Sequence, residues 1–181
     1  MKALTPVEQR FILHWGEMGT KWGINRTVAQ IHALLYISPK PLPAEEISET
    51  LSVARSNVSN SLKELQSWRI VKLVHVMGDK RDHFEALPDV WETFRIVLDE
   101  RKKREIDPTL AVLHECLAKT APGADRSSET SKYTEQRLRE LAVFFEVTTG
   151  WYGQICHWPA SAFVKFAKFG GQIQKLLGIG K

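Results

Sequence analysis

The sequence predicts a mainly α-helical fold with one small β-hairpin. Two observations in residues 44–87 carry this prediction. Ala44–Leu51 and Ala54–Trp68 have the apolar spacing of short amphipathic helices, separated by the tight turn Ser52-Val53. A strand, a turn and a second strand are expected next, at Val71–Met77, Gly78–Asp82 and His83–Leu87. This order of elements indicates a winged helix-turn-helix, flanked here by further helices suited to dimerisation.

The second predicted helix has an apolar side and a polar side. Val58, Leu62 and Leu65 share one side and should pack on Ile47 and Leu51 of the preceding helix. The polar side and its flanks carry Arg55, Ser56, Asn57, Ser59, Asn60 and Lys63. Such side chains can reach base edges and phosphates in a major groove. Many amphipathic helices have a polar face that only contacts water, so this helix alone does not establish DNA binding.

The predicted hairpin carries two basic residues at its tip. Gly78-Asp79 suits a turn, and Lys80 and Arg81 follow it. Basic side chains at this position can enter a minor groove or hold a phosphate. A neighbouring carboxylate can fix the Arg81 guanidinium through a bidentate pair. An ordinary exposed loop would also be charged, but the helix and the hairpin together are more specific than either alone.

The run LSVARSNVSNSLKELQSWRIVKLVHVMGDKRDHFEAL resembles the winged-helix domain of MarR-type transcriptional regulators. Trp22–Ser38 (WGINRTVAQIHALLYIS) and Glu105–Leu117 (EIDPTLAVLHECL) look more particularly like its GbsR branch. The resemblance implies a homodimer that binds a double-stranded DNA operator with inverted half-sites, usually as a repressor. It places the helix over residues 54–68 in the major groove and Arg81 in the minor groove. Ala54 stands where family members often carry Ser or Asp, so the N-cap side chain is missing.

Two helices are predicted before the helix-turn-helix. Thr5 and Glu8 form a capping box, with Pro6 at the first helical position. This helix has an apolar stripe of Val7, Phe11, Trp15 and Met18. Asn25 is expected to cap a second helix, Arg26–Ile37, whose inward side chains are Val28, Ile31 and Leu35. Ser38–Leu42 (SPKPL) is expected to be a loop, and Pro43 stands where a Ser would begin a capping box with Glu46.

Further helices are predicted after the hairpin. Pro88-Asp89 opens a long helix, and Asp107-Pro108 should kink it or start a new one with Asp107 as N-cap. Glu129–Trp158 is a further helical region whose broad apolar surface a second copy of the chain could cover. We divide the chain into N-terminal helices (1–37), a winged helix-turn-helix (38–87), a long kinked helix (88–119), a linker (120–128), and dimerisation helices with a basic amphipathic tail (129–181).

A small-molecule effector site is a further hypothesis. The resemblance to the GbsR branch implies choline- or betaine-type effectors, and quaternary ammonium groups favour aromatic cages. The candidate aromatic residues are Trp15, Trp22, Trp151, Tyr152 and Trp158. They could line a pocket if the two ends of the chain meet across a dimer. The alternative is that these rings only fill the dimer interface.

Composition and motifs favour a cytoplasmic DNA-binding protein over an enzyme. The chain has 181 residues and a formal net charge of +4, with a pI near 9.1, which suits a polyanionic partner. No N-terminal apolar run resembles a signal peptide, and we find no membrane-length apolar run, P-loop, GxGxxG or GxSxG motif in the sequence. Without these motifs we expect no catalytic residue and no cofactor. We expect no metal site either, because His114, Cys116, Cys156 and His157 lack the usual ligand spacing. The expected location is the cytoplasmic nucleoid.

Two alternative functions remain open at this point. A redox switch could use Cys116 or Cys156, because related regulators of the MarR type sometimes sense oxidants with cysteine. The tail Ser161–Lys181 carries lysines and aromatic residues without any acid, so it could bind an anionic membrane surface or a partner protein. Gly170-Gly171 interrupts this tail, and we expect no stable membrane association.

Overall fold

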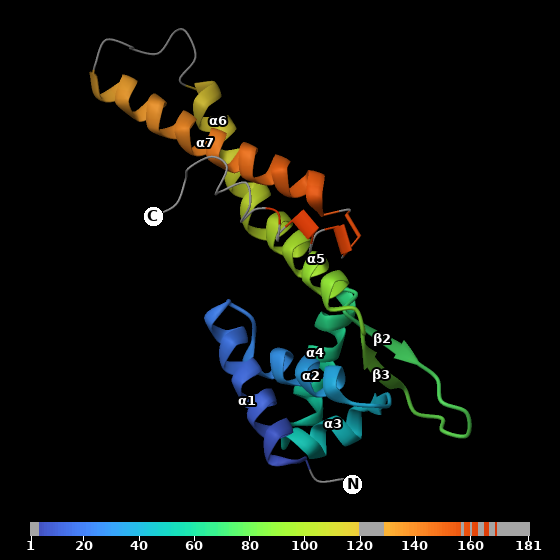
Figure 1. Cartoon of the computed structure of the whole chain (residues 1–181). Helices are drawn as coiled ribbons and strands as arrows, with labels where there is room; N and C mark the ends of the chain where they lie inside the picture. The colour runs from blue at the N-terminus through green and yellow to red at the C-terminus, as the bar shows by residue number, and fades with distance from the viewer. Residues whose placement is uncertain are drawn as a thin grey trace. The chain divides into compact units, whose positions relative to one another are not determined.

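The computed structural model describes residues 4–119, 129–156, 158–159, 161–162, 165–166 and 169 (Figure 1). The chain divides into two compact units, Met1–Val97 and Leu98–Lys181. In chain order, the first elements are α1 (Pro6–Lys21), α2 (Arg26–Ile37), β1 (Leu42–Pro43), α3 (Ala44–Leu51), α4 (Arg55–Ser67), β2 (Val71–Val74), β3 (His83–Ala86) and α5 (Val90–Arg101). A π-helical segment (Lys102–Ile106), α6 (Asp107–Lys119) and α7 (Glu129–Ile155) follow. The mainly helical fold with a small sheet is confirmed.

The predicted capping residues start α1 and α2. The backbone N–H of Thr5 donates to Glu8 Oε2 at 2.6 Å, and the Glu8 N–H donates to Thr5 Oγ1 at 3.3 Å. Asn25 Oδ1 accepts the N–H of Thr27 at 2.8 Å. These bonds satisfy backbone donors that have no partner inside the helix. The predicted capping box and N-cap are therefore confirmed.

The buried side of α1 differs from the predicted apolar stripe. Ile12, Gly16 and Gly19 are its buried residues, whereas Val7 is 78% exposed. At Gly19 the helix approaches α2 so closely that an added Cβ would lie 2.5 Å from the Cβ of Ala29. Small residues allow this approach, so they face α2. Of the predicted apolar stripe, Phe11 and Met18 are half-buried, whereas Val7 and Trp15 are exposed.

The core of the first unit lies between α2, α3 and α4. Val58, Leu62 and Leu65 of α4 are each at most 2% exposed, and Ile47 of α3 is fully buried. Leu51 packs at the edge of the same cluster. The sequence predicted this contact from helical spacing, and the structure confirms it. Burial of one side of α4 leaves its other side facing outward.

A three-stranded antiparallel sheet completes this unit, in the order β1-β3-β2. Leu42 and Leu73 both lie opposite Phe84, on its two sides. The short β1 includes the end of the predicted loop, Leu42. Pro43 is the N-cap of α3, whose bounds are those that the sequence predicted. Strand pairing ends at Val74 and His83, so residues 75–82 form a longer loop than predicted. In Figure 1 this loop projects away from the helices of its unit.

The backbone of the second unit stays helical across Asp107-Pro108. Asp107 has φ −59° and ψ −43°, which are helical values, so the prediction that it is an N-cap was wrong. Its Oδ1 instead accepts a hydrogen bond from Lys102 Nζ at 2.6 Å. Pro108 has no N–H and its ring clashes with the carbonyl four residues earlier. The wider π-helical turn directly before it accommodates this defect without ending the helix.

The second unit is built on α6 and α7, which lie side by side and run in opposite directions (Figure 1). Leu113 and Ala142 are buried between them, and His114 Nε2 lies 2.7 Å from Glu146 Oε1. The Tyr152 hydroxyl donates to Asp99 Oδ1 at 2.9 Å. The predicted linker 120–128 and most of the predicted tail fall outside the described residues. No helix in the described ranges has the length and apolarity needed to cross a membrane.

Candidate nucleic-acid interface

The turn between α3 and α4 sets the position of α4. Ser52 has a left-handed backbone with φ 53°, and its N–H donates to the carbonyl of Glu49. The Ser48 hydroxyl donates to the carbonyl of Val53 at 2.6 Å. A short hydroxyl can satisfy backbone groups within a turn in this way. These contacts hold the two helices in the compact arrangement expected of a helix-turn-helix.

The polar side chains of α4 lie together on its outer side. Arg55, Ser56, Asn57, Asn60 and Lys63 are exposed, and Ser59 is half-buried. The structure therefore places all six predicted groove-facing residues at the surface, opposite the buried apolar side. Their hydroxyl, amide and cationic groups are those that pair with base edges and phosphates.

The start of α4 differs from a simple capped helix. Ala54 provides no side-chain hydrogen bond to the first turn, as the sequence predicted. The guanidinium of Arg55 forms an ion pair with Glu45 on α3. The sequence analysis missed this partner, although Glu45 lies in the first turn of the preceding helix. The acid reduces the local positive potential at one end of the candidate recognition surface.

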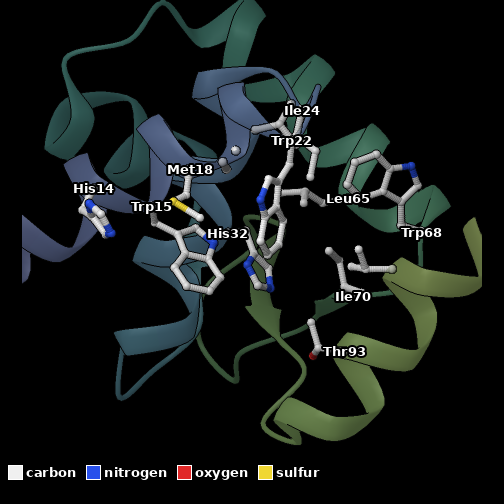
Figure 2. Close-up of a pocket in the computed structure, with 14 residues that line it drawn as sticks. His14, Trp15, Met18, Trp22, Ile24, His32, Leu65, Trp68, Ile70 and Thr93 are labelled. Carbon is white, nitrogen blue, oxygen red and sulfur yellow. The ribbon is translucent and has the colours of Figure 1, made fainter. Parts of the chain in front are cut away.

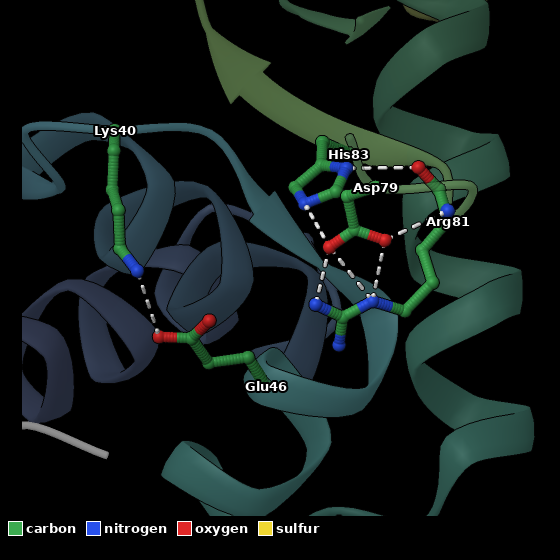
Figure 3. Close-up of polar contacts among 5 residues, drawn as sticks. All are labelled: Lys40, Glu46, Asp79, Arg81 and His83. Atoms are coloured by element: carbon green, nitrogen blue, oxygen red, sulfur yellow. Dashed lines mark hydrogen bonds and ion pairs between the residues drawn. The ribbon is translucent and has the colours of Figure 1, made fainter. Parts of the chain in front are cut away.

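A second ion pair fixes the wing formed by β2, β3 and the loop between them (Figure 3). Arg81 Nε lies 3.0 Å from both carboxylate oxygens of Asp79, and Arg81 Nη2 lies 2.5 Å from Oδ2. The Arg81 N–H also donates to Asp79 Oδ1 at 3.0 Å. Hydrogen bonding to Arg81 holds the pKa of the Asp79 carboxyl well below its usual range. The carboxylate is thus charged at neutral pH and keeps the guanidinium in one orientation.

His83 supports this pair from the sheet, a role that the sequence analysis missed. Its side chain is buried, its Nδ1 lies 2.8 Å from the carbonyl oxygen of Arg81, and its Nε2 lies 3.4 Å from Asp79 Oδ2. Lys80, the other predicted wing contact, is exposed. Outside the wing, in the same view, Lys40 Nζ and Glu46 Oε1 of α3 are 3.7 Å apart (Figure 3). The loop between β2 and β3 therefore presents one fixed cation, Arg81, and one exposed lysine, Lys80.

The predicted aromatic effector residues divide between the two units. Trp15 and Trp22 line a cavity of the first unit together with His32 (Figure 2). In the second unit, the rings of Trp151 and Trp158 lie 6.5 Å and 5.4 Å from that of Phe166. Tyr152 is the residue bonded to Asp99. Each unit thus gathers its own aromatic residues, and a combined cage stays a prediction.

Among the described residues, the other candidate chemical groups form no recognisable centre; His157 lies outside them. Cys116 and Cys156 are half-buried free thiols, and Cys156 Sγ lies 3.3 Å from the carbonyl oxygen of Gly153. A redox role for either thiol stays a prediction. Among the residues that the structure describes, no three His, Cys, Asp or Glu side chains gather as metal ligands would.

Comparison with known proteins points to one family. The sequence model of the MarR family matches residues 22–82 of this chain. The putative HTH-type transcriptional regulator YvaV of Bacillus subtilis (strain 168) is 28% identical over 94 residues, which cover 50% of this chain and 53% of that protein. The HTH-type transcriptional repressor OpcR of the same organism is 24% identical over 87 residues, 48% and 47% of the two chains. The chain therefore spans about half the length of these curated relatives.

A solved structure described as that of a transcriptional regulator shares the fold. The match covers 82% of this chain and 99% of that chain, with a TM-score of 0.51 and 18% sequence identity. This likeness supports the fold alone. The family match covers the helix-turn-helix and the wing up to Asp82. Residues 22–82, which contain the helix-turn-helix and most of the wing, are therefore similar to the MarR family.

Proposed function

We propose that this protein is a transcriptional regulator that binds double-stranded operator DNA through α4 and the wing. The observation that carries the proposal is the exposed polar side of α4 beside a wing whose Arg81 is held by Asp79. In this arrangement α4 enters the major groove and Arg81 the adjacent minor groove. The MarR-type fold of residues 22–82 supports the same use.

The regulator acts, in this proposal, as a homodimer on an inverted repeat in the cytoplasmic nucleoid. One small recognition helix contacts few bases, and two half-sites read together add affinity and specificity. The second unit supports dimerisation because α7 carries large exposed apolar side chains, among them Phe144, Val147 and Trp151, which are 60%, 65% and 51% exposed. An apolar face of this kind is commonly an interaction surface.

We further propose that the protein represses transcription and that a small molecule controls its affinity for the operator. One relative is described as a repressor, and the GbsR-like segments favour the same role here. A small-molecule effector would control operator affinity by binding one conformation in preference to another. Choline and glycine betaine, implied by the GbsR resemblance, are the first ligands to test.

Selection of bound fragments from genomic DNA by the purified full chain tests the proposed function. We expect enrichment of an inverted repeat, and weaker binding by Lys63→Ala. Lys132→Ala is a matched control, because Lys132 is an exposed lysine of the second unit. Salt-sensitive binding without an enriched sequence would contradict sequence-specific regulation. A monomer at micromolar concentration in sedimentation equilibrium would contradict the dimer.

A further inference from the structure

His83 is the first residue of β3, at the point where the loop 75–82 enters the sheet. Its backbone lies opposite Val74 of β2 and Pro43 of β1, so the strand is paired on both sides at this position. The side chain is only 7% exposed, and Figure 3 shows the ring beside the backbone of Arg81 and the carboxylate of Asp79. The sheet therefore holds this ring against the part of the loop that carries the proposed DNA contact.

The two oxygen atoms that the ring nitrogens meet can only accept hydrogen bonds. Nδ1 lies 2.8 Å from the carbonyl oxygen of Arg81, and Nε2 lies 3.4 Å from Asp79 Oδ2. A carbonyl oxygen has no proton to donate. The Asp79 carboxyl has none at neutral pH either, because its hydrogen bonds with Arg81 hold its pKa well below the usual range. A lone pair on either ring nitrogen would therefore face an acceptor.

The protonation states of the ring differ in how they meet these acceptors. A neutral ring with its proton on Nε2 would point the lone pair of Nδ1 at the carbonyl oxygen of Arg81, only 2.8 Å away. A neutral ring with its proton on Nδ1 would bond to that carbonyl but point the lone pair of Nε2 at a carboxylate. The imidazolium donates from both nitrogens. Burial of the ring opposes the charge, and the carboxylate at ion-pair distance favours it.

The other charged groups around the wing have different partners or are exposed. The neighbouring ion pairs are Lys40–Glu46, Arg55–Glu45 and Lys72–Glu85. The exposed charged or titratable residues of the loop itself, besides Arg81, are His75, Lys80 and Asp82. Glu45 and Glu46 of α3 also attract the Arg81 guanidinium. Asp79 is thus the acid that meets the ring, and His75 is the other group of the loop whose side chain normally changes charge between pH 5 and 8.

We propose that His83 is a positioning residue for the contact of Arg81 with DNA, and that it acts as an imidazolium that donates to the Arg81 carbonyl and to Asp79. The ring and the guanidinium then share one carboxylate, so Asp79, Arg81 and His83 together carry a net charge of +1 instead of zero. Phosphates attract the charged group more strongly, so DNA binding and protonation of His83 favour each other. This effect on DNA rests on the proposed function, whereas the protonation of the ring does not.

Nuclear magnetic resonance of the DNA-free full chain, with ¹⁵N-labelled histidine, tests the protonation state. A titration from pH 8 to pH 5 follows the Nδ1 and Nε2 resonances of His83. In Asp79→Asn, the ring should take up its second proton about one pH unit lower than in the wild type, because the carboxylate is lost and an amide can donate to Nε2. Asp82→Asn is the matched control, since it removes an exposed acid from the same loop and should leave the titration of His83 unchanged.

The affinity for the selected operator, measured from pH 8 to pH 5.5 at constant ionic strength, tests the effect on DNA. Binding should tighten by roughly 1.4- to 5-fold per wing, as expected of one additional exposed ion pair. In His83→Gln this contribution should disappear, because the amide can donate a hydrogen bond but stays neutral. A purely structural role would instead weaken binding by the same factor at every pH. His75→Gln is the matched control and should keep the pH dependence.

The outcomes separate the protonated ring from DNA binding. A neutral His83 ring throughout the titration, or the same titration in Asp79→Asn and the wild type, would overturn the proposal. Loss of the pH dependence in His75→Gln instead of His83→Gln would also overturn it. A protonated ring in a chain that binds no operator would support the assignment of the ring and refute the proposed function. The wild type and Asp79→Asn keep the buried ring, so misfolding of His83→Gln would not prevent the test.

Discussion

Asp79 holds Arg81 at the tip of the wing, with Arg81 Nε at 3.0 Å from each of its carboxylate oxygens. An acid next to a DNA-contacting cation weakens the positive potential there, but it also restricts the orientations of the guanidinium. Half of the Arg81 side chain remains exposed. The pair therefore favours a directed contact with DNA over a diffuse attraction to phosphate.

We predict that Arg81→Ala weakens operator binding by about 1–3 kcal/mol without lowering the melting temperature. Its side chain is exposed and lies outside the core, so its loss should not affect folding. Asp79→Asn should cause a smaller loss, because the guanidinium remains but is less firmly oriented. Fluorescence anisotropy with the selected operator measures both. An Arg81→Ala variant that binds as tightly as the wild type would show that the wing does not contact DNA.

Glu45→Gln tests the ion pair at the start of α4. Without its acidic partner, Arg55 can neutralise one more phosphate. We expect tighter binding to all DNA and a smaller preference for the operator. The plot of the logarithm of the binding constant against the logarithm of the salt concentration should become steeper by about one unit. Glu49→Gln removes one charge from the same helix at an exposed position and serves as control. Equal salt slopes in the two variants would contradict a specific role of the Arg55–Glu45 pair.

Asn60 and Lys63 should contribute differently to recognition. Both are exposed on α4, but an amide reads adenine edges, whereas an ammonium group acts as a point charge. We expect Asn60→Ala to relax base preference at one position of each half-site. Lys63→Ala should weaken binding to operator and unrelated DNA by similar factors. Affinities for a set of singly substituted operators measure this difference, and the reverse pattern would exchange the two assigned roles.

The lowered pKa of His32 predicts a pH dependence of stability. Between pH 6.5 and about 4 the unfolded chain binds a proton at this site and the folded chain does not. The free energy of unfolding should therefore fall with decreasing pH across this window, by about 3 kcal/mol in total, and be insensitive to His32 above it. Urea unfolding at several pH values measures the slope. In His32→Leu, this contribution to the pH dependence of the free energy of unfolding should be lost. If the variant and the wild type had the same slope, His32 would not be buried as described.

Gly19→Ala should lower the free energy of unfolding by about 1–3 kcal/mol, because its Cβ would meet that of Ala29 at 2.5 Å and force α1 away from α2. Gly150→Ala is the control, since Gly150 lies within α7 and a Cβ there would meet nothing within 4 Å. Alanine is the better helix former, so this change should be neutral or stabilising by up to about 1 kcal/mol. Chemical denaturation of both variants tests the close approach, and equal effects would refute it.

Local sequence signals were sufficient for the helix-turn-helix and for the caps of α1 and α2. Helical spacing of Val58, Leu62 and Leu65 predicted the buried side of α4, and its outer side followed by exclusion. Thr5, Glu8 and Asn25 act over two or three residues, which is why their roles could be read from sequence. Pro108 shows the limit of this reasoning. The missing N–H was predictable, but the π-helical turn that accommodates it was not.

The sequence by itself determined which segments are helices, which side of α4 is polar, and that a carboxylate could hold Arg81. Only the tertiary structure decided which acid pairs with Arg55, that His83 supports the wing, and that small residues rather than the large apolar stripe of α1 face α2. It also placed His32 beside a cavity, with no hydrogen-bond partner for its Nε2 atom among the described residues. The physical reason is the separation in sequence between the residues that interact. Caps and helical faces depend on residues one or two turns apart, whereas ion pairs, close approaches and cavities depend on distant segments whose distances the sequence does not specify.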